Sequence, residues 1–429
     1  QWLSAVGFRV SNGAVALLPN HNGGIESVCC GLSDLSDTDS WLKAVASLPA
    51  GEYRLVKPDG IAEQQWFDLH LHWAMAQYEF TQYRPSQAQG KKNLCVPADL
   101  DESLLVDWHA ALCRGRDLVN TPCEDCYPQT LVAVCEDLAR QYDAKVSVIE
   151  GDDLLAQGFP TVHRVGRAGG HAPCFIELNW GDPQHPKVCL LGKGVCFDTG
   201  GLDLKPPAGM RLMKKDMGGA ACVIALSEMI MRRQLPIQLS LLVPAVENNV
   251  SANAMMPGDV VTTRSGITVE ISNTDAEGRL ILCDALSYAV EQEPVKIIDF
   301  ATLTGAARVA LGPDLPVFFT NNENMAEALT AGAQHMGHPI WRMPLHAAYH
   351  RYLKSDIADM MNSANTGFAG AITAALYLQR FVPDSVPWAH FDVFTWNPEA
   401  KPGRPKGGEV DLVVGTYHYL ESLIKEKSL

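Results

Sequence analysis

The sequence has no run of about 18 apolar residues, the length that a membrane-spanning helix needs. It also opens on Gln1 and Trp2 without the basic segment and the apolar stretch of a secretory signal peptide. Neither a membrane span nor an export signal is therefore visible, and a cytoplasmic location is expected. Because the first residue is not Met, we expect the native chain to start upstream of Gln1.

Cysteine is too sparse for a disulfide framework, because the 429 residues contain 12 cysteines without the dense, regular spacing of small secreted domains. Several lie inside apolar runs, among them Cys135, Cys189 and Cys222, which indicates reduced thiols in a core. The single Cys-x-x-Cys, from Cys123 to Cys126, has no second pair at zinc-ribbon spacing. A chance spacing is favoured there over a metal or redox site.

Three common enzyme signatures are also missing. The sequence contains no Gly-x-x-x-x-Gly-Lys-Ser/Thr phosphate loop, no Gly-x-Ser-x-Gly nucleophile elbow and no His-Glu-x-x-His zinc helix. A nucleotide-dependent enzyme built on the glycine-rich segments 166–170 and 192–201 stays as an alternative, although no phosphate-loop consensus supports it. Detectable nucleotide binding would favour it.

Basic residues are the minority, since 34 lysines and arginines stand against 49 acidic residues and give a net charge of -15 with histidine neutral. Nucleic-acid binding is driven by clustered Lys and Arg, so this balance argues against a phosphate backbone as the main partner. An acidic surface that keeps a protein soluble explains the same total. With 47% hydrophobic and 19% charged residues, the chain has an ordinary globular composition.

The chain exceeds the roughly 250 to 300 residues at which one hydrophobic core stops growing, so two domains are expected. Residues 1–100 predict a small N-terminal α/β domain. Residues 101–118 carry an apolar stripe at helical spacing and predict a linker helix, which Pro122 separates from the rest of the chain. Residues 119–429 predict a larger C-terminal domain.

Helix and strand patterns alternate through the larger domain, which favours an α/β fold with a mixed sheet flanked by helices. Strands are expected at 14–18, 53–56, 145–149, 174–178, 188–191, 237–243 and 295–301, and helices at 66–80, 128–142, 219–232 and 280–291. In open sheets, ligands bind at the carboxyl ends of the strands. The loops 192–201, 273–279 and 302–305 adjoin such elements, so we expect them to converge.

Charged side chains are concentrated among glycines in and between these loops. They are Lys193, Asp198, Asp203, Lys205, Lys214, Lys215, Asp216, Asp275, Glu277 and Arg279. Charges near strand ends are costly to bury unless they are paired or bind a metal. Asp275 and Glu277 are two residues apart, so both face the same side of an extended loop, which suits a metal pair with a shared carboxylate. Each acid taken alone is better explained as a helix cap or a surface ion pair than as a metal ligand.

Taken together, these segments resemble the leucyl aminopeptidase family of di-metal exopeptidases. Asn273-Thr-Asp-Ala-Glu-Gly-Arg-Leu280 matches the signature octapeptide of that family in full. The other matching segments, in order along the chain, are 192–194, 197–201, 214–221, 301–306, 358–362, 370–375 and 388–392. The resemblance covers roughly Arg116 to the C-terminus, and several independent motifs in the family's order make coincidence a poor explanation.

The resemblance implies a catalytic site for two divalent ions, Zn²⁺ or Mn²⁺. The implied ligands are Lys193, Asp198, Asp216, Asp275 and Glu277, with Asp198 and Glu277 bridging the ions. Carboxylate oxygens suit either metal, and Lys193 must lose its proton to bind one. The ions would polarise the scissile carbonyl of a peptide with a free N-terminus and activate a bridging water.

Two basic residues are implied in catalysis rather than in metal binding. Lys205 matches the family's catalytic lysine and would stabilise the developing gem-diolate. Arg279 matches the arginine that holds a bicarbonate ion, which would act as general base. The backbone amides of Ala276, Gly278 and Leu303 would share this anion.

The resemblance also implies a first specificity pocket with Met213, Thr302 and Gly305 in its lining, an apolar slot suited to Leu-like residues. Phe394 and Trp396 stand where the family usually has small residues, and their bulk would narrow or reshape that pocket. Active members of the family assemble as hexamers, so a homohexamer is expected. The alternative is a non-catalytic binding role on the same scaffold, including DNA binding, which chelator-sensitive hydrolysis of an amino-acyl amide would exclude.

Overall fold

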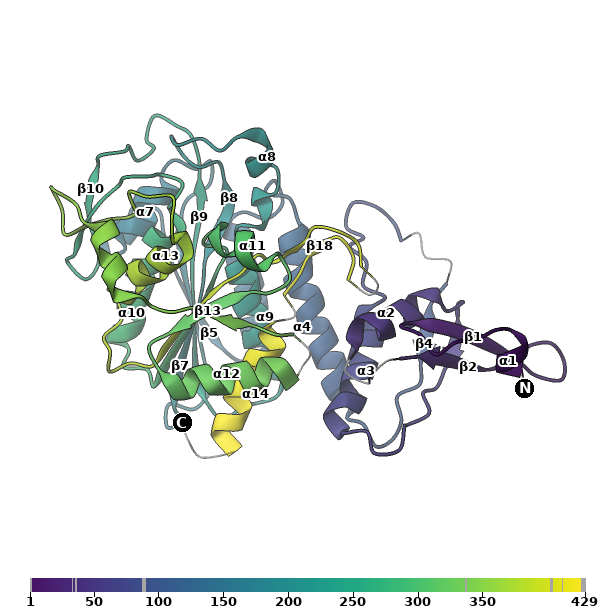
Figure 1. Cartoon of the computed structure of the whole chain (residues 1–429). Coiled ribbons are helices and arrows are strands. Elements are labelled where there is room, and N and C mark those ends of the chain that lie inside the picture. The colour runs from purple at the N-terminus through teal and green to yellow at the C-terminus, as the bar shows by residue number, and fades with distance from the viewer. Residues whose placement is uncertain are drawn as a thin grey trace. The chain divides into compact units, whose positions relative to one another are not determined.

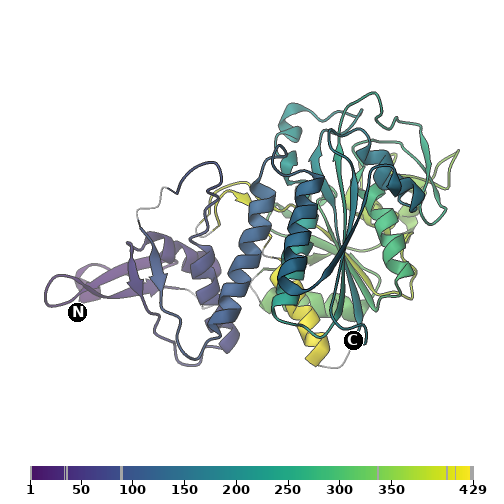
Figure 2. The same ribbon diagram turned by 180° about the vertical axis from the view of Figure 1, so that it is seen from behind.

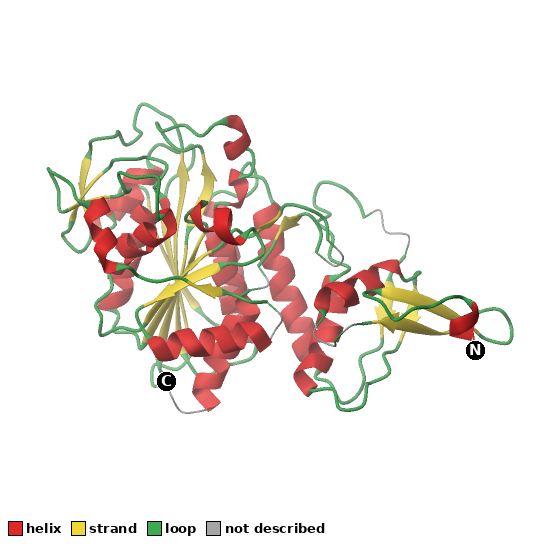
Figure 3. Cartoon of the chain, in the orientation of Figure 1, coloured by secondary structure: helices red, strands yellow, loops and turns green. Residues whose placement is uncertain are grey.

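A computed structural model of the chain describes residues 2–32, 34, 37–86, 90–335, 338–401, 404–410 and 412–425. The chain divides into two compact units, each with helices and strands (Figure 3). The smaller unit comprises Gln1–Cys113 and Asn397–Gly407, and the larger comprises Arg114–Trp396 and Gly408–Leu429. Among the described residues, no helix combines the length and the apolar composition that crossing a bilayer requires.

The smaller unit has the α/β character expected from the sequence. Its elements are α1 (Trp2–Ala5), β1 (Ala14–Pro19), β2 (Ile25–Gly31), α2 (Thr38–Ser47), β3 (Gly51–Tyr53), α3 (Glu63–Met75) and β4 (Lys92–Leu94). The pair β1 and β2 is antiparallel and the pair β3 and β4 is parallel. Trp41, Trp66 and Trp73 are buried in its core. The strand expected at 53–56 lies at Gly51–Tyr53 instead, so only Tyr53 was placed correctly, and it pairs with the equally short β4.

The amphipathic stripe after residue 101 forms α4 (Glu102–Asn120), which confirms the helix predicted there. Leu105, Trp108 and Leu112 from that stripe are buried. The helix ends two residues before Pro122, whose ring disfavours a helical conformation in the residue before it.

The larger unit is built on a mixed sheet of nine strands (Figures 1 and 2). The strands are β5 (Lys145–Glu150), β6 (Cys174–Trp180), β7 (Lys187–Gly192), β8 (Gly194–Asp198), β9 (Gln238–Asn248), β12 (Lys296–Ala301), β13 (Val317–Thr320), β14 (Trp341–Arg342) and β16 (Trp388–Asp392). Eight of them follow the order β14-β13-β16-β12-β7-β9-β6-β5, and β8 pairs with β9. The central pairs β16/β12, β12/β7 and β7/β9 are parallel, whereas β13/β16, β9/β6 and β6/β5 are antiparallel.

Helices cover both faces of this sheet (Figures 1 and 2). On one face α7 (Pro160–Gly166) and α13 (Gly370–Gln379) pack against α10 (Gly278–Glu291). On the other face α5 (Pro128–Tyr142) and α14 (Val413–Lys425) pack against α9 (Gly218–Arg232), and α12 (Glu323–His335) packs against α14. The remaining elements are α6 (Asp153–Ala156), α8 (Pro207–Met210), η1 (Met213–Lys215), β10 (Val260–Thr262), β11 (Thr268–Glu270), α11 (Ala306–Leu311), η2 (Ala347–Leu353), β15 (Met360–Met361), β17 (Trp396–Asn397) and β18 (Gly407–Gly408).

The predicted mixed sheet flanked by helices is confirmed, and each strand and helix expected in the larger unit is present. The strands expected at 188–191 and 295–301 are both central in the sheet, where strands covered on both faces are mainly apolar, although the second contains the buried Asp299. The strands β13 and β14 were not expected, because their four and two residues are too short for a periodic pattern.

Close packing of α9 on the sheet gives a stability prediction. A Cβ atom on Gly219 would lie 2.1 Å from the carbonyl oxygen of Phe300 and 2.9 Å from the amide nitrogen of Lys193. Gly219→Ala is therefore expected to destabilise the larger unit by at least about 2 kcal/mol, as overpacking against a rigid backbone does. The measurement is the urea midpoint of unfolding.

Gly209→Ala is the matched control, because a Cβ on Gly209 meets nothing closer than 3.8 Å. Its free energy of unfolding should stay within a few tenths of a kcal/mol of that of wild type, so the urea midpoint should barely change. An equal midpoint for both variants would show that α9 does not pack this closely on β12.

Candidate metal centre

The predicted ligands lie at the ends of the strands β7 and β8 and just before the helices α9 and α10. Lys193 separates β7 from β8, and Asp198 is the last residue of β8. Asp216 follows η1 and stands just before α9, while Asp275 and Glu277 belong to the loop that leads into α10. The convergence expected from the sequence is therefore present.

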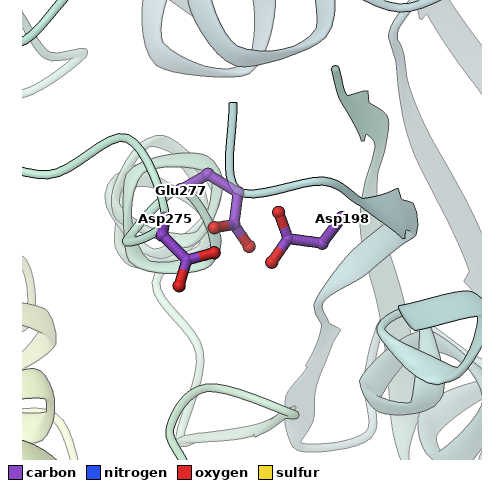
Figure 4. A group of neighbouring side chains, drawn as sticks. All are labelled: Asp198, Asp275 and Glu277. Carbon is purple, nitrogen blue, oxygen red and sulfur yellow. The ribbon is translucent and has the colours of Figure 1, made fainter. Parts of the chain in front are cut away.

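Three carboxylates of this set point into one space (Figure 4). Asp198, Asp275 and Glu277 each place an oxygen so that all three oxygens lie within 4.8 Å of one another. Asp216 joins them through Lys193, whose Nζ lies 2.7 Å from Asp216 Oδ2 and 2.9 Å from Glu277 Oε1. All five side chains that were expected to bind metal thus belong to one cluster.

Two lysines lie among these acids. The Nζ of Lys205 is 2.8 Å from Asp198 Oδ2 and also contacts Asp275 Oδ1. Burial alone would lower the pKa of both lysines, but the acids around them outweigh burial and raise it: Asp216 and Glu277 act on Lys193, and Asp198 and Glu277 act on Lys205. Without metal, both lysines are held as ammonium ions.

Acidic groups outnumber basic ones in the cluster, since four carboxylates face two ammonium groups. Burial, with Asp198 as the next contribution, raises the pKa of Glu277 to about 8. Glu277 is 1% exposed, and its Oε2 accepts no hydrogen bond from any residue in the described part of the chain. A buried carboxylate oxygen without a donor is costly unless a cation meets it. The donor set therefore fits divalent cations.

Neighbouring polar residues orient Asp198. Its Oδ1 accepts hydrogen bonds from Asn248 Nδ2 and from the amide of Gly200, each 2.8 Å long. Asn248 also donates to the carbonyl of Thr274 at 3.1 Å, which ties the β8 loop to the α10 loop. Sequence reasoning missed Asn248 and included Thr274 only as part of the octapeptide 273–280. The signal available in the sequence was a polar residue, Asn248, at the end of the long apolar strand β9. In the structure Asn248 pairs in register with Asp198.

Arg279 lies in the first turn of α10 and is 6% exposed. Its Nη1 donates to the carbonyl of Asn362 at 2.7 Å, while no described residue accepts a hydrogen bond from its Nε. The Asn362 side chain in turn donates to the carbonyls of Asn273 and Ala276, so it shapes the ligand loop. Asn362 was noted in the sequence only as part of a motif. In the structure its hydrogen bonds hold the loop that carries Asp275 and Glu277.

The three residues whose amides were expected to share a bicarbonate ion with Arg279 have different surroundings. Ala276 and Leu303 line the same pocket as Arg279. Gly278 lies against Lys193, and a Cβ on it would meet Lys193 Cε at 2.7 Å. The amide of Leu303 donates to Asp392 Oδ1 at 3.0 Å, so this amide already has an acceptor.

A pocket of about 280 Å³ opens over the cluster. Met213, Thr302 and Gly305, the residues expected to select a substrate side chain, are in its lining. Thr302 also fixes Asp216, since its Oγ1 donates to Asp216 Oδ1 at 2.8 Å. Phe394 and Trp396, whose bulk the sequence placed near this pocket, are not among its described lining residues.

Sequence reasoning missed two further lining residues, Lys215 and Arg308. Lys215 was noted among the charged residues without a role, and Arg308 was not singled out. Burial lowers the pKa of Lys215 to about 8 and lowers the pKa of Arg308. Arg308 stands two residues after the matching segment 301–306, and this proximity was the signal available for it.

Comparison with known proteins gives consistent matches over most of the chain. A family model described as "Cytosol aminopeptidase family, catalytic domain" matches residues 114–414, and one described as "M17 aminopeptidase, N-terminal domain" matches residues 1–97. The chain is 44% identical over 283 residues to a "Probable cytosol aminopeptidase" of Chlamydia caviae, an alignment that spans 65% of this chain and 56% of that protein. It is 43% identical over 298 residues to a protein of the same description from Syntrophotalea carbinolica, with 68% and 60% covered. The chain therefore matches little more than half the length of these curated relatives.

Two solved structures share the fold over nearly the whole chain. The crystal structure of the cytosol aminopeptidase from Coxiella burnetii superposes with a TM-score of 0.94 at 46% identity and covers 98% of this chain and 92% of that chain. The bottromycin maturation enzyme BotP in complex with Mn superposes with a TM-score of 0.90 at 32% identity, with 98% and 96% covered. Both likenesses include the smaller and the larger unit.

Proposed function

The chain belongs to the cytosol aminopeptidase family, and from this premise we propose that it is a metal-dependent aminopeptidase that removes the N-terminal residue of peptides. The observation that carries the proposal is a cluster of four carboxylates, three of them buried, in which Glu277 Oε2 has no donor among the described residues. Such a cluster suits a cation far better than a closed protein core.

We propose that Lys193, Asp198, Asp216, Asp275 and Glu277 hold two divalent ions, with Asp198 and Glu277 shared between them. When bound, such ions polarise a carbonyl and lower the pKa of a coordinated water toward neutrality. The oxygen-rich donor set suits zinc or manganese alike, and the manganese complex of BotP supports the second. Lys193 has to release its proton as a metal arrives, which a neighbouring dication favours.

Lys205 is proposed to stabilise the charge that develops on the scissile carbonyl oxygen. Its side chain is 14% exposed and lies in the lining of the pocket, so it can reach a bound substrate. The ion pairs with Asp198 and Asp275 hold the ammonium group in place before the substrate arrives. A donor fixed in advance does not have to reorganise during the reaction.

Arg279 is proposed to hold a bicarbonate ion that acts as the general base. Its buried guanidinium, with Nε free of described acceptors, supports an anion at this place. The amides of Ala276, Gly278 and Leu303 remain the proposed additional donors, although the Leu303 amide also serves Asp392.

The wider biological setting is also a proposal. We infer cytoplasmic peptides with a free N-terminus as substrates and a homohexamer as the assembly, both from the family. A DNA-binding or other non-catalytic role is the second candidate, and the net charge of -15 speaks against DNA. Met213 supports binding of an apolar side chain, but Lys215 and Arg308 also face the pocket.

Metal binding should be visible as stabilisation of the purified chain. Protein stripped with a chelator is expected to unfold at a lower temperature than protein supplied with Zn²⁺ or Mn²⁺, because the ions bind only the folded cluster. At a free ion concentration of about 100 times Kd the gain is about 2.7 kcal/mol. Calorimetry of the stripped and the loaded chain measures it, and Mg²⁺ at equal ionic strength is the control.

The direct test of the proposed function is the hydrolysis of amino-acyl amides by the same two samples. Hydrolysis is expected only in the metal-loaded sample. Stabilisation by Zn²⁺ or Mn²⁺ without hydrolysis of any amide would favour the non-catalytic role.

A further inference from the structure

The pocket over the metal cluster has a second charged region, formed by Lys215 and Arg308. Lys215 is 3% exposed. Within the described residues, neither side chain donates a hydrogen bond or forms an ion pair. Two buried or half-buried basic groups without an anionic partner are costly in a folded protein.

One aromatic ring serves as the platform for both groups. The guanidinium carbon of Arg308 lies 3.9 Å from the centroid of the Phe394 ring, and the Nζ of Lys215 lies 5.0 Å from it. Stacking on a ring offsets part of the cost of burial. It leaves the N–H groups without acceptors, so the arrangement keeps its hydrogen-bonding capacity for a ligand.

The nearest acids are already engaged elsewhere. Asp216 accepts hydrogen bonds from Thr302 and contacts Lys193 at 2.7 Å. The carboxylate of Asp392 accepts from the amides of Leu303 and Thr304, each at 3.0 Å. Both acids act on Lys215 and Arg308 only through longer-range attraction. A carboxylate from outside the chain would be the direct partner.

These groups lie in the part of the pocket proposed to receive the side chain of the first substrate residue. A Cβ on Gly305 would lie 3.0 Å from Arg308 Nη2, so glycine there leaves room for the guanidinium at the lining. Met213 belongs to the same short η1 turn as Lys215. An apolar contact and two hydrogen-bond donors therefore adjoin one another in this subsite.

We propose that this subsite binds the side-chain carboxylate of an N-terminal Glu or Asp, so that acidic first residues are preferred over Leu. The methylene groups of a glutamyl side chain would contact Met213 and its carboxylate would reach Arg308 and Lys215. A guanidinium matches the geometry of a carboxylate, and Lys215 donates hydrogen bonds in either protonation state. The inference rests on the proposed aminopeptidase function and replaces the Leu-like preference expected from Met213 and Gly305.

The test compares α-(4-nitroanilides) of Glu, Gln and Leu as substrates of the metal-loaded full chain. Gln has the shape of Glu without its charge, so the ratio of kcat/KM for Glu over Gln isolates carboxylate recognition. Wild type is expected to favour Glu by at least about tenfold, the usual effect of a hydrogen bond to a charged group. Arg308→Gln should bring this ratio close to one, and Arg308→Lys, which keeps the charge, should restore part of it.

Arg380→Gln is the matched control, because Arg380 is exposed at the C-cap of α13. It should keep the wild-type ratio and the wild-type activity. Equal kcat/KM for the Glu and Gln anilides in wild type, together with hydrolysis of the Leu anilide, would overturn the inference and leave the proposed function standing. Failure to hydrolyse any of the three substrates would reject the proposed function and the inference with it.

A free C-terminal carboxylate on a short peptide is the other source of the same chemistry. Comparing Leu-Gly with Leu-Gly amide separates the two sources. A preference for the free acid that Arg308→Gln removes, with Glu and Gln anilides cleaved equally, would assign the basic pair to the leaving side of the peptide and overturn the assignment to the first residue.

Discussion

Glu277→Gln is expected to lower kcat/KM for leucyl amide by more than about 100-fold. The substitution keeps the shape of a side chain that is 1% exposed and removes the charge that a shared metal ligand needs. Loss of a residue that only supports a metal ligand costs about 10- to 100-fold, and loss of a ligand between two ions exceeds this range. The measurements are steady-state kinetics with Zn²⁺ or Mn²⁺ and the metal content of the protein.

The same substitution should leave the metal-free protein folded and at least as stable as metal-free wild type. Burial raises the pKa of Glu277 to about 8, and its Oε2 has no donor, so a neutral amide of the same shape costs no more to bury there than the acid does. Activity and metal-free stability are thus predicted to move in opposite directions. A variant that is merely misfolded would lose both.

Glu291→Gln is the control for this prediction, because Glu291 lies on the same helix and pairs with Arg264 at the surface. Its loss should change stability by less than about 1 kcal/mol and leave turnover unaltered. Near-normal turnover in Glu277→Gln would refute the assignment of the metal ligands.

The elements that sequence patterns predicted best are those in which local signals and burial agree. The helix at 128–142 has Pro128 at its start and the left-handed Asp143 at its C-cap, and its expected bounds match the structure. Central strands such as β7 and β12 are mainly apolar and almost fully buried. The short edge strands carry neither signal and depend on partners far away in the sequence.

The metal cluster was only partly predictable from the residues themselves. The spacing of Asp275 and Glu277 before a helix indicated a shared site, but the same spacing also fits a helix cap. Assignment of Lys193 and Asp216 required the family resemblance, because a lysine between two strands has no local mark of a ligand. The structure adds that Lys193 bridges Asp216 and Glu277, a contact between three distant segments.

The roles of Lys215 and Arg308 could not be predicted from the sequence for a different reason. Their significance arises from the ring of Phe394, which follows β16 and stacks beneath both groups. The sequence indicated Phe394 as an unusual bulky residue, and the expected consequence was a narrower pocket. In the structure Phe394 supports two basic side chains that themselves line the pocket. The contact of Phe394 with two basic groups can be recognised only in the structure, and it makes the charge of the pocket more important than its width.

Lys205→Met is expected to lower kcat by about 100- to 1,000-fold, the cost of removing one donor that stabilises charge in the transition state. Metal content should change little, because Lys205 is not proposed as a ligand. KM should also change less than kcat, since the lost hydrogen bond is strongest when the carbonyl oxygen becomes charged. Kinetics and metal analysis on one preparation separate these effects.

Lys354→Met controls for the loss of a lysine as such, because Lys354 is exposed and lies outside the pocket. It should keep the wild-type kcat. The combination of a low kcat with full metal content distinguishes Lys205→Met from Glu277→Gln, which loses activity together with metal. If Lys205→Met instead lost its metal while retaining turnover after metal addition, the ion pairs of Lys205 with Asp198 and Asp275 would serve only to position ligands, and the proposed role on the carbonyl oxygen would be wrong.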